Sequence, residues 1–312
     1  MKTSIETISI IGAGALGAVY AAMLYDMDPR SVAFVAGGER AERLRREGVV
    51  VNGKSYHIPV LTPDDLSAPC DLVIVAVKDQ HLDQAIANMK NRVGDQTLIL
   101  SVMNGIESEE RLGAAYGMQK VLYCVALGID ALREENRVTY TTQGKLFIGE
   151  ADNAALTERL RRVQALFEKT GIVYETPPDM LRILWWKFMI NVGINQTSAV
   201  LRAPYGRFQT EREPRDLMHA AMREVVALAA KAGVDLAEVD IDAFDPFLMR
   251  LNPQGKTSML QDVEAGRKTE VEMFAGRVIE LGRRYEVPTP VNQNLFYQIR
   301  KIESDGATNR PG

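Results

Sequence analysis

The stretch ISIIGAGALG, residues 8–17, joins a short apolar run to three closely spaced glycines. Residues 8–11 predict a buried strand, and the alanine-rich residues that continue to Tyr25 predict a helix. In such a strand–turn–helix unit the first glycine permits a tight turn, the second lets the backbone approach a pyrophosphate, and the third lets the helix pack on the strand. The helix N-terminus would then face the anion. The residues predicted to contact a dinucleotide are Gly12, Ala13, Gly14, Ala15, Leu16 and Gly17.

The same stretch allows one alternative. Residues 8–25 carry no charge, as in a signal peptide or a membrane anchor. Against this, Glu6 precedes the stretch, Asp26 and Asp28 follow it, and its glycines lower its hydrophobicity. We therefore favour the nucleotide site and expect a cytoplasmic protein with no membrane partner.

The rest of the first half favours an α/β sheet. Residues 71–77 and 97–102 are almost continuous apolar runs, as expected for parallel strands covered on both faces. The dipeptide Asn52-Gly53 predicts a hairpin turn, and a second hairpin is expected around Gln143-Gly144. The predicted strands are residues 31–36, 71–77 and 97–102, and the predicted helices are residues 39–47 and 82–89.

Polar residues follow both of the continuous apolar runs. The first run ends at Lys78 and the second leads into Asn104. Ligands in open α/β sheets bind at the carboxyl ends of the strands, so both residues are candidates for cofactor contact. Taken singly, each could equally be an ordinary loop or cap residue.

The end of the second predicted strand bears on which dinucleotide would bind. A cofactor with a free ribose 2′-hydroxyl usually meets an acid there, but this chain has Ala36-Gly37-Gly38. Arg40 follows and could accommodate a 2′-phosphate, which favours NADP. Glu39 keeps NAD open, and the arginine could also belong to a solvated helix face.

The second half is expected to be helical. After a strand at residues 171–176, Pro177-Pro178 marks a boundary, and no convincing strand follows. We expect a Rossmann-like NADP-binding domain at residues 1–177 and an all-helical substrate domain at residues 178–312. The predicted helices are residues 184–200, 215–231, 242–251, 269–284 and 291–302.

One predicted helix carries a narrow polar line. In LWWKFMINVGINQ, residues 184–196, Lys187, Asn191 and Asn195 are spaced by four and therefore share one face. A lysine is costly to bury without a partner. The line could be polar groups of a core helix that bond to neighbouring backbone, or it could face a ligand.

Composition narrows the function classes. The 312 residues are long enough for two domains, and the net charge of −4 with no basic tract makes nucleic acid an unexpected partner. Cys70 and Cys124 lie in apolar surroundings and are expected to be reduced core thiols. The three histidines match no metal-ligand spacing, so no metal is expected.

The chain resembles the ketopantoate reductase (2-dehydropantoate 2-reductase) family over nearly its full length. The blocks that carry the resemblance are IGAGALG, AVK ending at Lys78, MNG at Asn104, KFMINVGIN at Lys187, and SMLQDVEAGRKTE at residues 258–270.

The resemblance implies roles for these residues. Lys187 matches the general acid of the family, and Glu270 matches the glutamate that supports it. Asn191, Asn195 and Ser258 match substrate contacts, while Lys78 and Asn104 match the nicotinamide side. Without the resemblance, Ser258 with Gln261 would be interpreted as a helix capping box and Glu270 as a first-turn acid.

The match is incomplete. Tyr205 and Gly255 stand where the family commonly has substrate-facing asparagines, and Gly37 replaces a frequent arginine. The leading hypothesis is NADPH-dependent reduction of ketopantoate to pantoate, in pantothenate and coenzyme A biosynthesis, by a monomer or homodimer. The alternatives are a reductase of another small 2-oxo acid and a non-catalytic, NADPH-sensing protein. A sensor would have no need for Lys187 and Glu270 together.

Overall fold

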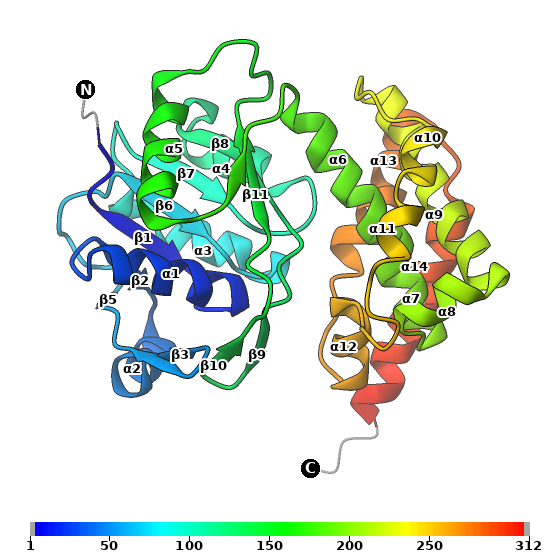
Figure 1. Cartoon of the computed structure of the whole chain (residues 1–312), viewed down its shortest axis with the longest axis horizontal. Coiled ribbons are helices and arrows are strands. Elements are labelled where there is room, and N and C mark those ends of the chain that lie inside the picture. The colour runs from blue at the N-terminus through cyan, green and yellow to red at the C-terminus, as the bar shows by residue number, and fades with distance from the viewer. Residues whose placement is uncertain (1–3, 309–312) are drawn as a thin grey trace. The chain divides into compact units, whose positions relative to one another are not determined.

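The computed structural model describes residues 4–308 of the chain, with side chains as far as residue 305. The chain folds into two compact units, Met1–Ile183 and Leu184–Gly312. Helix α6, Met180–Ile190, begins in the first unit and continues into the second (Figure 1). Within the described residues, no helix has both the length and the apolar character needed to cross a membrane.

The first unit is built on a mixed sheet with the strand order β12-β11-β8-β7-β6-β1-β2-β5. All neighbouring strands are parallel except β8 and β11. The parallel centre confirms the expected Rossmann-like sheet. The strands are β1 Ile8–Ile11, β2 Val32–Val35, β5 Val60–Leu61, β6 Leu72–Val75, β7 Leu98–Ser101, β8 Val121–Leu127, β11 Lys145–Gly149 and β12 Tyr174–Glu175.

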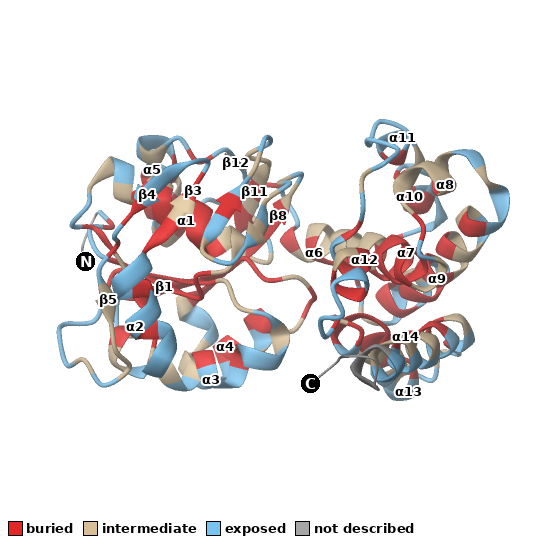
Figure 2. Cartoon of the chain, turned by 90° about the horizontal axis from the view of Figure 1, so that it is seen from below, coloured by how far each residue is buried: buried red, intermediate tan, exposed pale blue. Residues whose placement is uncertain are grey.

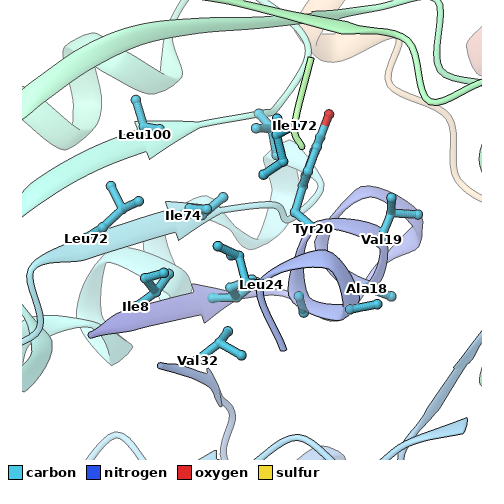
Figure 3. Packing of buried hydrophobic residues seen from close by; sticks show 14 of the residues in the cluster. Ile8, Ala18, Val19, Tyr20, Leu24, Val32, Leu72, Ile74, Leu100 and Ile172 are labelled. Carbon is cyan, nitrogen blue, oxygen red and sulfur yellow. The ribbon is translucent and has the colours of Figure 1, made fainter. Parts of the chain in front are cut away.

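Helices cover both faces of this sheet, because successive side chains of a buried strand point to opposite faces. Leu72 and Ile74 pack with α1 and α5, while Val73 and Val75 pack with α3 and α4. Figure 3 shows Leu24 of α1 lying over the strands of the sheet. The helices of the first unit are α1 Ala15–Met27, α2 Gly38–Glu47, α3 Leu82–Asn88, α4 Ser108–Tyr116 and α5 Glu158–Thr170, with short 3₁₀ turns at Asp79–His81, Lys90–Arg92 and Met118–Lys120.

A second, four-stranded sheet in the same unit has the order β4-β3-β10-β9. Its strands are β3 Val49–Val51, β4 Lys54–Tyr56, β9 Leu132–Glu134 and β10 Arg137–Thr139. The hairpin turn predicted at Asn52-Gly53 is confirmed, since β3 pairs antiparallel with β4 and both turn residues have positive φ, +46° and +83°.

The second predicted hairpin is wrong. Strand β10 pairs with β9 and β3, whereas β11 pairs with β8, so the two strands that flank Gln143-Gly144 belong to different sheets. The reversal into β10 occurs at residues 135–136, where Glu135 has a φ of +52°. Gly144 serves a different purpose: a Cβ there would lie 2.4 Å from the Leu127 carbonyl oxygen, so only glycine allows this close approach.

The second unit is helical, as expected. The helix predicted at residues 242–251 does not form as one element. Residue 242 is the last residue of α10, and residues 245–248 form the separate helix α11. A π segment interrupts the helix predicted at residues 184–200, and the helix predicted at residues 269–284 begins with another at residue 272. The elements after α6 are the first π segment Asn191–Asn195, α7 Gln196–Leu201, α8 Tyr205–Thr210, α9 Arg212–Lys231, α10 Glu238–Asp242, α11 Asp245–Leu248, α12 Ser258–Glu264, the second π segment Glu272–Gly276, α13 Arg277–Tyr285 and α14 Pro290–Thr308.

Candidate functional site

The glycine turn, residues 12–17, joins β1 to α1 in the first unit. Gly12 has a φ of +107°, and a Cβ there would lie 2.4 Å from the Ala76 carbonyl oxygen. A Cβ on Gly17 would lie 1.9 Å from the Gly12 carbonyl oxygen. Both glycines are therefore required by packing inside the protein itself.

Gly14 differs from its two neighbours. A Cβ there would meet the Ala76 carbonyl oxygen at 3.6 Å, an ordinary van der Waals distance, and its φ of −73° suits any residue. The fold does not require glycine at this position, whereas a pyrophosphate pressed against the backbone would. Gly14 is the N-cap of α1, which has no side-chain cap and no acid in its first turn, so its N-terminus suits an anion.

A pocket of about 350 Å³ opens beside the turn, at the carboxyl ends of β1 and β2. This volume lies within the range of small-molecule sites. Its wall includes Gly12, Ala36, Gly37 and Arg40 from the predicted cofactor region. The polar lining residues that sequence reasoning did not assign are His81, Gln84 and Asn88.

Three arginines gather near this region. Arg40 and Arg43 lie on α2, which is exposed along much of its length (Figure 2), and Arg133 comes from β9. Desolvation, and then the charge of Arg43, lower the pKa of Arg40. Desolvation, and then the charges of Arg40 and Arg43, lower the pKa of Arg133. Three mutually repelling cations on one surface are suited to a multiply charged anion.

Arg133 also reaches the glycine turn directly. Its Nη1 donates a hydrogen bond to the Ala13 carbonyl oxygen, and its Nε donates to the Glu135 carbonyl oxygen at 2.7 Å. Sequence reasoning missed this residue, because it lies 120 positions from Ala13 and in a separate sheet. Arg133 has no short motif around it that could have revealed the contact.

The two polar residues at strand ends occupy the expected positions. Lys78 follows β6 as an exposed residue and precedes the 3₁₀ turn at Asp79–His81. Asn104 follows β7, is half-buried, and precedes Gly105, which has a φ of +87°. Both lie just beyond the carboxyl ends of neighbouring parallel strands.

In the helical unit, the polar line lies on α6 and the first π segment. Lys187 and Asn191 are half-buried, and Asn195 is buried. Asn195 Nδ2 donates to Asn191 Oδ1 at 3.3 Å, so the two amides are in contact. π-Helical turns inside α-helices occur frequently at functional sites.

Asn191 holds the most informative atom of this group. Its Nδ2 is buried and has no hydrogen-bond partner in the described structure. A buried N–H without a partner costs about 1–3 kcal/mol. Core contacts among the described residues therefore leave this donor unsatisfied, and a ligand that accepts a hydrogen bond would suit it.

The capping interpretation of Ser258 is wrong. The N-cap of α12 is Thr257, whose Oγ1 accepts from the Leu260 amide at 3.2 Å and donates to Ser198 Oγ at 3.2 Å. Ser258 is the first residue of the helix and is exposed. Its hydroxyl is thus not needed as the helix cap, and α12 packs against α7 and the first π segment.

Glu270 is half-buried and lies in the bend before the second π segment, where its carbonyl oxygen accepts from the Phe274 amide at 3.1 Å. The two π segments pack against each other. The candidate residues of the helical unit therefore lie on segments that are in contact.

Tyr205 and Gly255, the two departures from the family pattern, touch each other. The Tyr205 amide donates to the Gly255 carbonyl oxygen at 3.0 Å. A Cβ on Gly255 would lie 2.9 Å from Tyr205 Cδ2 and 2.9 Å from the Asn252 carbonyl oxygen. The phenol ring thus covers the space that a side chain at position 255 would need, so the two departures are structurally coupled.

Among the side chains that the structure describes, no group of three or more His, Cys, Asp or Glu residues could hold a metal ion. Cys70 and Cys124 are both buried.

Two family models match the chain. Ketopantoate reductase PanE/ApbA matches residues 8–153, and Ketopantoate reductase PanE/ApbA C terminal matches residues 179–303. The chain is 28% identical over 301 residues to the 2-dehydropantoate 2-reductase of Archaeoglobus fulgidus, with 96% of this chain and 99% of that protein covered.

Two solved structures share the fold of this chain. The 2-dehydropantoate 2-reductase from Geobacter metallireducens has a TM-score of 0.83 and 26% identity, over 95% of this chain and 99% of that one. A D-mandelate dehydrogenase, solved with NADH and anilino(oxo)acetate, has a TM-score of 0.85 at 19% identity, over 96% of this chain and 99% of that one, and shows the shared fold. Because the two family models together span both units, the chain belongs to the ketopantoate reductase family.

Proposed function

We propose that this chain reduces 2-dehydropantoate to pantoate with NADPH, a reaction of pantothenate and coenzyme A biosynthesis. The observation that carries the proposal is the polar line of the helical unit, in which the buried Nδ2 of Asn191 has no hydrogen-bond partner among the described residues. The family membership and the 2-dehydropantoate 2-reductases among the relatives support the same reaction.

The glycine turn and the three arginines are the residues proposed to hold the cofactor. The space beside the Gly14 backbone fits a pyrophosphate. The charges of Arg40, Arg43 and Arg133 fit a ribose 2′-phosphate. The fold alone does not favour NADPH, since the D-mandelate dehydrogenase of similar fold was solved with NADH. When bound, the cofactor supplies the hydride.

Lys187 is proposed as the general acid. As charge develops on the ketone oxygen, a positioned ammonium stabilises it and then donates a proton to that oxygen. Glu270 is proposed to orient the lysine and to offset its partial burial. Asn191, Asn195 and Ser258 are proposed to hold the substrate in register, which lowers the entropic cost of the reaction.

A second candidate is a reductase of another small 2-oxo acid on the same scaffold. The contact between Tyr205 and Gly255 favours it, because a phenol and a glycine replace two amides that would otherwise bond to substrate. A site without those amides imposes a smaller penalty on an acid that lacks the matching hydroxyl.

The test is oxidation of NADPH and NADH by the purified protein against a panel of 2-oxo acids that includes ketopantoate. We expect the highest kcat/KM with ketopantoate and NADPH. A higher value with a different acid would establish the second candidate. Tight NADPH binding with no turnover of any acid would leave only the sensor hypothesis.

A further inference from the structure

A series of hydrogen bonds through two buried amides and one carboxylate links α7, α9, α14 and the two π segments of the helical unit. Gln196, the first residue of α7, is fully buried, as is Asn292 on α14. Gln196 Nε2 donates to Asn292 Oδ1 at 3.0 Å, and Asn292 Nδ2 donates to Glu224 Oε2 on α9 at 2.7 Å. Buried polar groups of this kind are costly unless every donor and acceptor is used.

The second π segment has a backbone amide that needs an outside partner. The Phe274 amide donates to the Glu270 carbonyl at 3.1 Å, four residues back, and the Gly276 amide donates to the Val271 carbonyl at 3.0 Å, five residues back. The change of register skips the Ala275 amide, which lies between them. That amide donates instead to Gln196 Oε1 at 3.0 Å.

The same side chain bonds to the first π segment. Gln196 Nε2 also donates to the Val192 carbonyl oxygen at 2.8 Å. Val192 lies directly after Asn191 and three residues before Asn195. The amide of Gln196 therefore uses both its donor and its acceptor groups, and it joins the backbones of the two π segments.

The far end of this series of hydrogen bonds, at Glu224, is bonded to the N-terminus of a helix. Glu224 Oε1 accepts from the Val291 amide at 2.7 Å and Oε2 accepts from the Asn292 amide at 3.0 Å, at the start of α14. A carboxylate is stabilised there by the helix dipole as well as by these bonds. Gln196 is thus held on three sides, by the two π segments and by this anchor.

We propose that Gln196 is a positioning residue for the reaction. It fixes the segment that carries Asn191 and Asn195 against the segment that follows Glu270, so that the substrate amides and the supporting carboxylate keep one relative geometry. This inference rests on the proposed function, because it gives these residues their roles. Gln196 itself acts through them and need not touch the substrate.

The main variant is Gln196→Met, which keeps the length of the side chain and removes its polar groups. The matched control is Leu248→Ala, which opens a cavity at a fully buried position on α11. Each protein is assayed for amide hydrogen exchange, for NADPH affinity, and for kcat and KM with the acid that serves best in the panel. All assays are run at a temperature where circular dichroism shows every protein folded.

We expect Gln196→Met to lose exchange protection in residues 191–197 and 272–276 together and to keep its NADPH affinity. Its kcat/KM should fall by about 10²-fold, the scale of a misplacement of about 1 Å. The control should lose protection around α11 and keep its kcat/KM. In an Asn191→Ala background the loss caused by Gln196→Met should shrink, because both changes act through one group.

An unchanged kcat/KM in Gln196→Met, or a loss that is fully additive with Asn191→Ala, would overturn the proposal. If Gln196→Met does not fold, Gln196→Glu decides. The ionised carboxylate keeps the acceptor for Ala275 and removes the donor to Val192 and Asn292, so protection should fall at residues 191–197 and at the start of α14 and be kept at residues 272–276. Uniform loss would contradict the linkage. The exchange measurement needs no turnover. A wild-type chain that reduces no 2-oxo acid would therefore remove the proposed function without being mistaken for a failure of the linkage.

Discussion

The glycine turn of the first unit and the two π segments of the second are held in place by different means. In the glycine turn, backbone approaches backbone: a Cβ on Gly17 would lie 1.9 Å from the Gly12 carbonyl oxygen. In the π segments, the side chain of Gln196 bonds to the Ala275 amide, which the change of register skips, and to the Val192 carbonyl oxygen. The glycine turn therefore depends on positions without a Cβ, whereas the π segments depend on one buried side chain.

This difference determines how each region can be altered. A turn defined by glycines fails sterically at particular positions and tolerates change at others. A region defined by shared hydrogen bonds fails through coupling, so that one substitution affects residues on another segment.

The largest effect is expected in the helical unit, from Lys187→Ala. Loss of a general acid typically lowers turnover by about 10²–10⁴-fold. The affinity for NADPH should be kept, since the proposed cofactor residues lie in the first unit. Steady-state kinetics and NADPH titration measure the two quantities, with the exposed Lys268→Ala as control. Near-normal turnover would remove Lys187 from the mechanism.

Within the glycine turn, Gly17→Ala and Gly14→Ala should separate folding from binding. Gly17→Ala should lower the free energy of unfolding by about 1–3 kcal/mol or more, as overpacking does. Gly14→Ala should lower the free energy of unfolding by less than about 1 kcal/mol, the scale of an N-cap change. It should also weaken NADPH binding. Urea unfolding and NADPH titration measure both. Equal destabilisation by the two variants would show that Gly14, too, is a packing glycine.

The third prediction concerns the cofactor. Arg133→Gln should lower the preference for NADPH over NADH about tenfold or more, because hydrogen bonds to charged groups contribute about 1.5–3 kcal/mol. Loss of the bond to Ala13 should lower kcat/KM with both cofactors equally, so it cancels in the ratio of the two values. Arg137→Gln, an exposed change on β10, is the control. An unaltered ratio would exclude Arg133 from 2′-phosphate recognition.

The smallest effect is expected at the contact between Tyr205 and Gly255. Gly255→Asn alone should not raise the preference for ketopantoate over its deoxy analogue, 2-oxo-3,3-dimethylbutanoate, because the Tyr205 ring blocks the new side chain. Combining Gly255→Asn with Tyr205→Asn should raise that preference by a factor of about ten. This is within the range for a site that hydrogen-bonds a substrate hydroxyl. The measurement is the kcat/KM ratio of the two acids. An equal gain from the single variant would show that the ring does not obstruct position 255.

Much of the first unit follows from its sequence. The glycine turn, the central parallel strands and the Asn52-Gly53 hairpin all rest on local rules, and all are present. The second hairpin was wrong because Gly144 is needed for a close approach to Leu127, which nothing in its local sequence reveals. Helix α5 was not predicted, although Thr157 caps its start and Gly171 ends it with a φ of +71°.

The candidate site divides in the same way. The spacing of Lys187, Asn191 and Asn195 shows from sequence alone that they share a face. That the two amides bond to each other, and that one buried nitrogen has no hydrogen-bond partner among the described residues, depends on how the helices pack. Thr257 rather than Ser258 caps α12, a displacement of one residue that frees the candidate hydroxyl.

By itself, the sequence determined the α/β and helical halves, the dinucleotide turn and the polar line. Each of these depends on residues close together in the chain, because backbone preference and periodicity are local properties. Only the tertiary structure decided that Arg133 bonds to the glycine turn and lies near Arg40 and Arg43, that Tyr205 covers Gly255, and that Gln196 joins two π segments. Each of these joins segments distant in sequence, and their contacts arise from the packing of whole elements, for which no short stretch of sequence carries a signal.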